Sequence, residues 1–122
     1  MILSLKEKNA VICGSTQGIG LAVAKELALL GANCIMLARN ELTLQQAVRL
    51  LDVSQGQQHE YAVADFSNTQ QVKTAIEKIV QSRAVHVLIN NTGGPAPGPI
   101  TDATPENFNN GFQQHIINNQ LL

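Results

Sequence analysis

The segment Asn9-Ala-Val-Ile-Cys13-Gly14-Ser-Thr-Gln-Gly18-Ile-Gly20 joins a short apolar run to a helical pattern through three glycines. A run of this length that ends at glycine predicts a buried strand over residues 9–13. From Gly18 onward, apolar residues recur at the spacing of one helix face, and Gly31 supplies the stop. The positions on that face are Ile19, Val23, Leu27 and Leu30. The segment therefore predicts a strand, a glycine loop and a helix over residues 18–30.

Three more apolar runs predict strands over residues 33–38, 60–64 and 85–89. Because helical patterns alternate with these strands, the fold class is α/β with a parallel sheet. Right-handed crossovers give the strand order 3-2-1-4, a Rossmann-like doubly wound sheet truncated after about four strands. The fourth strand is then an exposed apolar edge. We expect residues 1–122 to form one domain, the N-terminal part of an NAD(P)-binding Rossmann domain.

Three further helices are expected, each with a start signal in the sequence. Asn40 is suited to cap the helix after the second strand. Ser67-Asn-Thr-Gln70 has the spacing of a capping box and opens the next helix. Thr104-Pro105 begins the last one. The apolar positions of these helices are Leu44, Ala47, Val48 and Leu51, then Val72, Ala75, Ile76, Ile79 and Val80, then Phe108, Phe112 and Ile116.

The composition is that of a soluble globular protein, with 44% hydrophobic residues, 14% charged residues and a net charge of −1. The lack of a basic excess argues against nucleic acid and anionic membranes as partners. No apolar run is long enough to span a bilayer, and the N-terminus lacks a signal-peptide pattern, so we expect a cytoplasmic location. Cys13 and Cys34 lie in apolar runs without a CxxC partner, which favours buried thiols over a disulfide.

The three glycines have separate physical roles in a loop of this kind. Gly14 lets the chain turn sharply off the strand, Gly18 lets backbone approach a pyrophosphate, and Gly20 lets the helix pack tightly on the sheet. The pyrophosphate then lies at the helix N-terminus, where free N–H groups and the helix dipole favour anions. A glycine-rich turn without a ligand is the alternative, but the position between strand and helix favours nucleotide binding.

The loop spacing G-x-x-x-G-x-G resembles that of the short-chain dehydrogenase/reductase family rather than the common G-x-G-x-x-G fingerprint. Asp65-Phe66 lies where the family places an acidic residue against the adenine amino group. Asn90-Asn91-Thr92-Gly93 is similar to the family's Asn-Asn-Ala-Gly, and the Gly93-Gly94-Pro95 extension resembles members related to 3-oxoacyl-carrier-protein reductases. The resemblance covers nearly the whole chain. It implies the cofactor-binding part of an NAD(P)-dependent oxidoreductase of carbonyls and alcohols.

The loop and the resemblance together define the expected cofactor-binding residues. They are Gly14, Ser15, Thr16, Gln17, Gly18, Ile19, Gly20, Arg39, Asn40, Asp65, Phe66, Asn91, Thr92 and Gly93. NAD-preferring proteins of this class end the second strand with Asp or Glu, but no carboxylate precedes Glu41 here. Arg39 is suited to a forked contact with a 2′-phosphate, and Ser15 and Thr16 can add hydroxyl contacts. We therefore expect NADP(H) rather than NAD(H), with Arg39 as a solvated surface charge as the alternative.

The residues expected to perform the family's chemistry do not form a recognisable set. The family uses a Tyr-x-x-x-Lys pair and a Ser, which the resemblance places after the present C-terminus. Tyr61 is the only tyrosine, has Asp65 at its fourth following position and is expected to pack in the third strand. The resemblance places the family's catalytic Asn at or near His115, with Asn118 and Asn119 as alternatives. We assign no catalytic residue, and expect His115 to be a polar helix residue.

The other two histidines, His59 and His86, are expected to be unpaired, and no metal-ligand spacing links the three. We therefore assign no metal site.

Three functional hypotheses remain open. The chain is part of an oxidoreductase whose longer parent supplies the catalytic residues, or a non-catalytic nucleotide-binding or interaction module, or an inactive fragment. Whether it is an enzyme is thus left open. A homo-oligomer through the last helix or the exposed sheet edge is expected, because an apolar helix face needs a partner surface.

Overall fold

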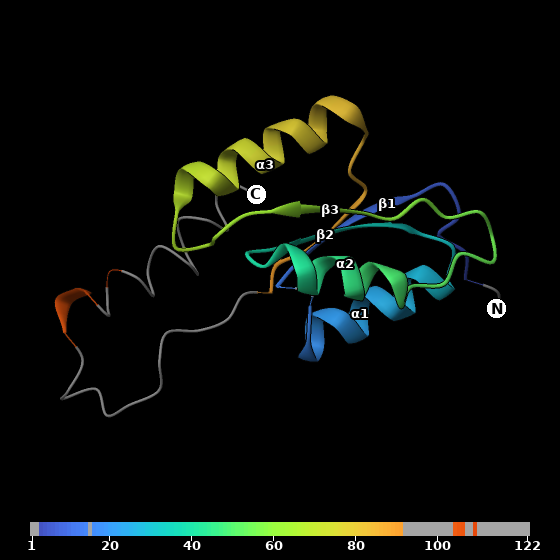
Figure 1. Cartoon of the computed structure of the whole chain (residues 1–122). Helices are drawn as coiled ribbons and strands as arrows, with labels where there is room; N and C mark the ends of the chain where they lie inside the picture. The colour runs from blue at the N-terminus through green and yellow to red at the C-terminus, as the bar shows by residue number, and fades with distance from the viewer. Residues whose placement is uncertain (1–2, 15, 92–103, 107–108, 110–122) are drawn as a thin grey trace.

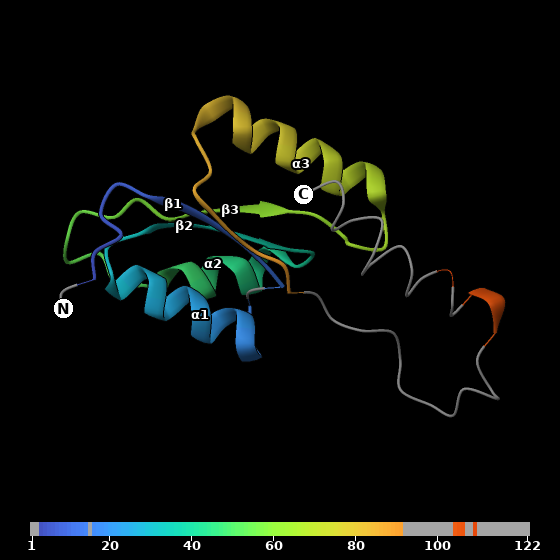
Figure 2. The ribbon, with the colours of Figure 1, turned by 180° about the vertical axis from the view of Figure 1, so that it is seen from behind.

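The computed structural model describes residues 3–14, 16–91, 104–106 and 109. Within these residues one parallel sheet has the order β3-β2-β1-β4, which confirms the predicted fold class and strand order. Helices α1 and α2 cover one face of the sheet, and α3 covers the other (Figures 1 and 2). The elements are β1 (Asn9–Cys13), α1 (Gly18–Leu29), β2 (Asn33–Ala38), α2 (Glu41–Arg49), β3 (Glu60–Val63), α3 (Thr69–Ser82) and β4 (Val87–Ile89).

The predicted bounds of β1 and β2 are confirmed, whereas α1, β3 and β4 each have one end that differs from the predicted one by one or two residues. β3 ends at Val63, although the Ala64 N–H still donates to the Ala38 carbonyl at 2.9 Å. β4 begins at Val87 rather than residue 85, because its pairing with β1 begins with Val87 opposite Ala10. In the last predicted helix Pro105, Glu106 and Asn109 are helical. Its apolar residues Phe108, Phe112 and Ile116 lie outside the described residues.

The core is divided between the two faces of the sheet, because successive side chains of a strand point to opposite sides. Ile12, Cys34 and Met36 are buried with α1 and α2, whereas Cys13 and Leu37 are buried with α3. The predicted buried thiols are confirmed, since both cysteines are free and fully buried. Burial raises the pKa of the Cys13 thiol to about 12 and that of Cys34 to about 11, so both are protonated at neutral pH.

The predicted apolar face of α1 is only partly confirmed, because Leu27 packs against the core but Ile19 does not. Gly20, Ala24 and Ala28 are the buried residues, whereas Ile19 is 74% exposed. Close approach of the helix to the sheet explains the choice, because a Cβ at position 20 would overlap the Gly14 carbonyl oxygen. Small side chains therefore face the sheet, and the larger ones are pushed outward. The apolar face predicted for α3 includes one residue too many, since Val80 is 56% exposed.

The capping box predicted at residues 67–70 is also wrong, by one residue. Asn68 is the N-cap of α3, and its side-chain oxygen accepts from the Gln71 N–H at 3.2 Å. Asn68 and Gln71 have the same three-residue spacing as Ser67 and Gln70, so spacing alone does not separate the two registers.

The expectation that His59 and His86 are unpaired is wrong. Each ring accepts a hydrogen bond from a backbone N–H near the start of a strand. The Cys34 N–H donates to Nδ1 of His59 at 3.0 Å, and the Asn9 N–H donates to Nδ1 of His86 at 3.0 Å. With Nδ1 as acceptor, Nε2 of His59 carries the proton and donates to the Asp52 carbonyl at 2.7 Å. Both histidines are thus structural residues at the amino end of the sheet.

Gln57 is a buried polar residue that holds the end of α1 against the loop before β3. Its amide nitrogen donates to the Ala28 carbonyl at 2.7 Å and to Asp52 Oδ2 at 3.2 Å, and its amide oxygen accepts from the Gln55 N–H at 2.8 Å. Replacing Gln57 with methionine removes all three bonds from a buried position. We expect the free energy of unfolding, measured by urea denaturation, to fall by about 1–3 kcal/mol.

The control is Gln46→Met on the exposed face of α2, which should change the unfolding free energy by less than about 0.5 kcal/mol. Equal effects of the two substitutions would show that the Gln57 bonds do not stabilise the fold.

Within the described residues, no helix is both long enough and apolar enough to cross a bilayer.

Candidate functional site

The expected cofactor residues that the structure describes lie after the carboxyl ends of the four strands. Gly14 follows β1, Arg39 follows β2, Asp65 follows β3 and Asn91 follows β4. Because the strands are parallel, these ends share one edge of the sheet, which is where open α/β sheets bind ligands. Ser15, Thr92 and Gly93 lie outside the described residues.

The glycine loop is in contact with the segment after β4. Gly14 has a φ of +59°, and Asn91 Nδ2 donates to its carbonyl oxygen at 3.3 Å. A Cβ at position 14 would overlap the Asn91 carbonyl oxygen, and one at position 20 would lie 2.9 Å from Asn91 Nδ2. The expected roles of Gly14 as a turn and of Gly20 as a packing residue thus have a structural basis. Asn91 holds the two glycines together from the neighbouring strand.

Gly18 differs from the other two glycines because it faces open space. It begins α1 with a φ of +60°, and a Cβ built on it would have no atom within 4 Å. No neighbouring atom among the described residues occupies this space, so only the positive φ disfavours a side chain here. Gln17 and Ile19 beside it are exposed, and Thr16 is half-buried. The arrangement leaves backbone at the start of α1 accessible to a ligand.

The N-terminus of α1 lacks the caps that the other helices have. Asn40 accepts from the Thr43 N–H at 3.2 Å to cap α2, and Asn68 caps α3 in the same way. Within the part of the chain that the structure describes, no side chain caps α1 at Gln17, and its first turn carries no acidic residue. The first N–H groups of an uncapped helix and its dipole form a site for an anion such as a pyrophosphate.

Arg39 and Asp65 form the charged part of the site. Arg39 is exposed directly after β2. The backbone N–H and then the hydroxyl of Ser67 donate to Asp65 Oδ1, at 2.9 and 2.7 Å, and lower the pKa of this carboxyl. The positive charge of Arg39 lowers the pKa of Asp65 further. Phe66 beside them is half-buried against the α3 side of the core.

Tyr61 is a packing residue, as expected. It is half-buried on the α1 and α2 side of the sheet, and its hydroxyl accepts from Gln45 Nε2 and donates to Glu41 Oε1, both at 3.1 Å. His115, Asn118 and Asn119 lie outside the described residues. In the described part of the chain, no group of three or more His, Cys, Asp or Glu could hold a metal ion.

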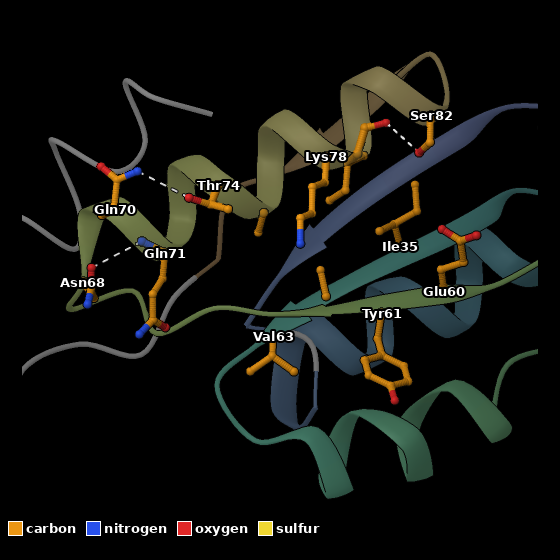
Figure 3. A pocket seen from close by; sticks show the side chains of 13 residues that line it. Ile35, Glu60, Tyr61, Val63, Asn68, Gln70, Gln71, Thr74, Lys78 and Ser82 are labelled. Atoms are coloured by element: carbon orange, nitrogen blue, oxygen red, sulfur yellow. Dashed lines mark hydrogen bonds between the residues drawn. The ribbon is translucent and has the colours of Figure 1, made fainter.

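A hollow of about 570 Å³ lies between β3 and α3 (Figure 3). Val63 of the strand and Thr74 and Lys78 of the helix contribute to its walls. None of the expected cofactor residues that the structure describes lines it. The hollow follows the open edge strand of the sheet, whereas the glycine loop lies at the strand ends. Size alone therefore does not identify the cofactor site.

Gln71 was missed in the sequence although it contacts the site. Its side-chain oxygen accepts from the Asp65 N–H at 3.0 Å. The spacing of Asn68 and Gln71 was a usable signal, because Gln at this position of a helix commonly reaches back toward the preceding loop.

The family model described as short chain dehydrogenase matches residues 8–117. The uncharacterized oxidoreductase YvrD of Bacillus subtilis (strain 168) is 35% identical over 117 residues, which cover 96% of this chain and 44% of the relative. The inactive hydroxysteroid dehydrogenase-like protein 1 of Homo sapiens is 37% identical over 90 residues, which cover 74% of this chain and 27% of the relative. The chain thus spans less than half the length of these curated relatives.

Two solved structures have the same arrangement of elements. L-Sorbose reductase from Gluconobacter frateurii, complexed with NADPH and L-sorbose, has a TM-score of 0.90 and 28% identity, covering 100% of this chain and 47% of that one. A 3-oxoacyl (acyl-carrier-protein) reductase from Agrobacterium tumefaciens C58 with NADP bound has a TM-score of 0.84 and 22% identity, covering 96% and 45%. The second likeness concerns the fold alone.

Proposed function

Because the chain belongs to the short-chain dehydrogenase/reductase family, we propose that its glycine loop binds NADP(H) as the cofactor-binding part of a carbonyl or alcohol oxidoreductase. One observation carries the proposal: among the described residues no side chain caps the first turn of α1, which begins at the open Gly18, while α2 and α3 are capped by asparagine. A pyrophosphate supplies the acceptors that this turn lacks. The sugars and bases on either side then lie along the carboxyl edge of the sheet.

The choice of NADP(H) is supported by the charges beside this turn. Arg39 is exposed after β2, where an NAD-binding protein would carry a carboxylate. A guanidinium there can make two parallel bonds to the 2′-phosphate of NADP(H). The L-sorbose reductase structure holds NADPH, which agrees with this choice.

Nucleotide binding without turnover is the second candidate function. Tyr61 is the only tyrosine of these 122 residues, and its hydroxyl is hydrogen-bonded to Gln45 and Glu41, away from the strand ends. One relative is named an inactive hydroxysteroid dehydrogenase-like protein. We therefore expect these 122 residues to bind NADPH but not to oxidise it with ketones or oxoacyl thioesters, since a proton donor is lacking. NADPH oxidation that survives mutation of Tyr61 and His115 would contradict this expectation.

Cofactor binding is tested by titrating NADPH into the chain and following nicotinamide fluorescence, with 2′,5′-ADP as competitor. We expect saturable binding that the competitor displaces. Gly18→Ala should weaken it by at least about tenfold, since the new methyl group projects into the space assigned to the pyrophosphate.

Gly56→Ala is the matched control for this variant. Gly56 also has a positive φ, +82°, and no atom within 4 Å of a Cβ built on it, but it lies in the turn before β3. The two variants therefore have similar backbone strain, and only the one in the glycine loop should lose affinity. Equal losses, or no binding by the unmodified chain, would refute the proposed site.

A homo-oligomer through the last helix or the sheet edge stays a prediction. Val87, Leu88 and Ile89 of the outer strand β4 are only half-buried, which supports a partner along that edge.

A further inference from the structure

Gln71 connects the start of α3 to the loop that carries Asp65. It is the third residue of the helix, and its backbone N–H donates to the capping oxygen of Asn68 at 3.2 Å (Figure 3). Its side-chain oxygen accepts from the Asp65 N–H at 3.0 Å. One residue therefore joins the helix to the loop through both its backbone and its side chain.

This side-chain bond departs from the usual capping box. In that motif the side chain at the third position accepts from the N–H of the capping residue itself. Here the Asn68 N–H already donates to the Asp65 carbonyl at 2.8 Å. Gln71 instead accepts from the N–H of Asp65, so both backbone polar groups of Asp65 are bound to the first turn of α3.

The side chain of Asp65 is held as firmly as its backbone. Oδ1 accepts two hydrogen bonds from Ser67, at 2.9 and 2.7 Å. Among the residues that the structure describes, no group donates to Oδ2. The carboxylate is thus oriented through one oxygen, and the other is left as an acceptor at the carboxyl edge of the sheet.

We propose that Gln71 is a positioning residue which, by fixing the backbone of Asp65, directs this free oxygen toward the exocyclic amino group of adenine. The inference rests on the proposed NADP(H) site and adds to it a residue outside the glycine loop. It makes Gln71 a determinant of base selectivity, since a base that carries oxygen instead of the amino group would face the carboxylate with a second acceptor.

The test compares NADPH with its deaminated analogue, nicotinamide hypoxanthine dinucleotide phosphate in the reduced form. The unmodified chain should bind NADPH about tenfold more tightly than the analogue, as expected for one hydrogen bond to a charged group. Gln71→Met, which has a similar length but no acceptor, should reduce this ratio of dissociation constants to about threefold or less. Gln71→Glu keeps an acceptor oxygen and should keep the ratio.

The control is Gln70→Met on the adjacent position, which contacts Thr74 rather than Asp65. It should leave the ratio unchanged. All three variants retain the cap of α3, because that bond uses the backbone of residue 71. A general loss of stability would weaken the binding of both nucleotides alike, so the ratio separates positioning from folding.

The outcomes distinguish this inference from the proposed function. Failure of the unmodified chain to bind either nucleotide would overturn both. If the unmodified chain binds NADPH and its analogue with equal affinity, the inference alone is overturned. The same holds if Gln71→Met keeps the tenfold ratio of dissociation constants. A ratio that is lost in Gln71→Met and kept in Gln71→Glu supports it.

Discussion

Replacing Gly14 with alanine is expected to lower the free energy of unfolding by roughly 3–5 kcal/mol, a large part of the stability of a small domain. The φ of +59° at this position accounts for about 1–2 kcal/mol in a residue with a side chain. The remainder comes from the overlap of the new methyl group with the Asn91 carbonyl oxygen, a backbone atom that cannot rotate aside. Urea denaturation followed by circular dichroism measures the loss.

Gly56→Ala again serves as the control, since its backbone is similarly strained but its surroundings are open. It should cost only about 1–2 kcal/mol. If the two substitutions destabilise the chain equally, the contact between Gly14 and Asn91 does not restrict the loop.

Replacing Arg39 with aspartate is expected to reverse the cofactor preference. The unmodified chain should bind NADPH about 10- to 100-fold more tightly than NADH, because a charge-assisted bond contributes about 1.5–3 kcal/mol. Aspartate repels the 2′-phosphate and accepts hydrogen bonds from the ribose hydroxyls of NADH, so that NADH becomes the tighter ligand. Fluorescence titration with the two reduced cofactors gives the ratio of dissociation constants directly.

Arg49→Asp changes charge by the same amount at the far end of α2, and should leave that ratio unchanged. Equal affinity of the unmodified chain for NADPH and NADH would show instead that Arg39 is a solvated surface charge.

Features that depend on residues close together in the sequence could be predicted from it. The run of residues 9–13, the glycines after it and the alternation of strands with helices were enough for the strand order, because crossovers between parallel strands have one hand. The same local pattern located Gly14, Gly18 and Gly20. The structure adds that Gly18 faces open space while the other two are enclosed.

Features that depend on the packing of distant segments were missed. The buried face of α1 is made of Gly20, Ala24 and Ala28, and hydrophobic periodicity favours the larger Ile19 because it ignores how closely a helix approaches a sheet. His59 accepts from a residue 25 positions away, and His86 from one 77 positions away. No spacing rule connects such pairs before the sheet is assembled.

The contact between Gly14 and Asn91 also ties the proposed nucleotide binding to the order in which the chain folds. The two residues are 77 positions apart, so the contact closes one of the longest loops in the described structure. A chain emerging from the ribosome has its first β–α unit long before β4 is available to brace it. Its glycine turn then lacks Asn91, the residue that encloses Gly14 and Gly20. Affinity for the dinucleotide should therefore arise late, when β4 has joined β1, and bound cofactor would report that the sheet has closed on that side.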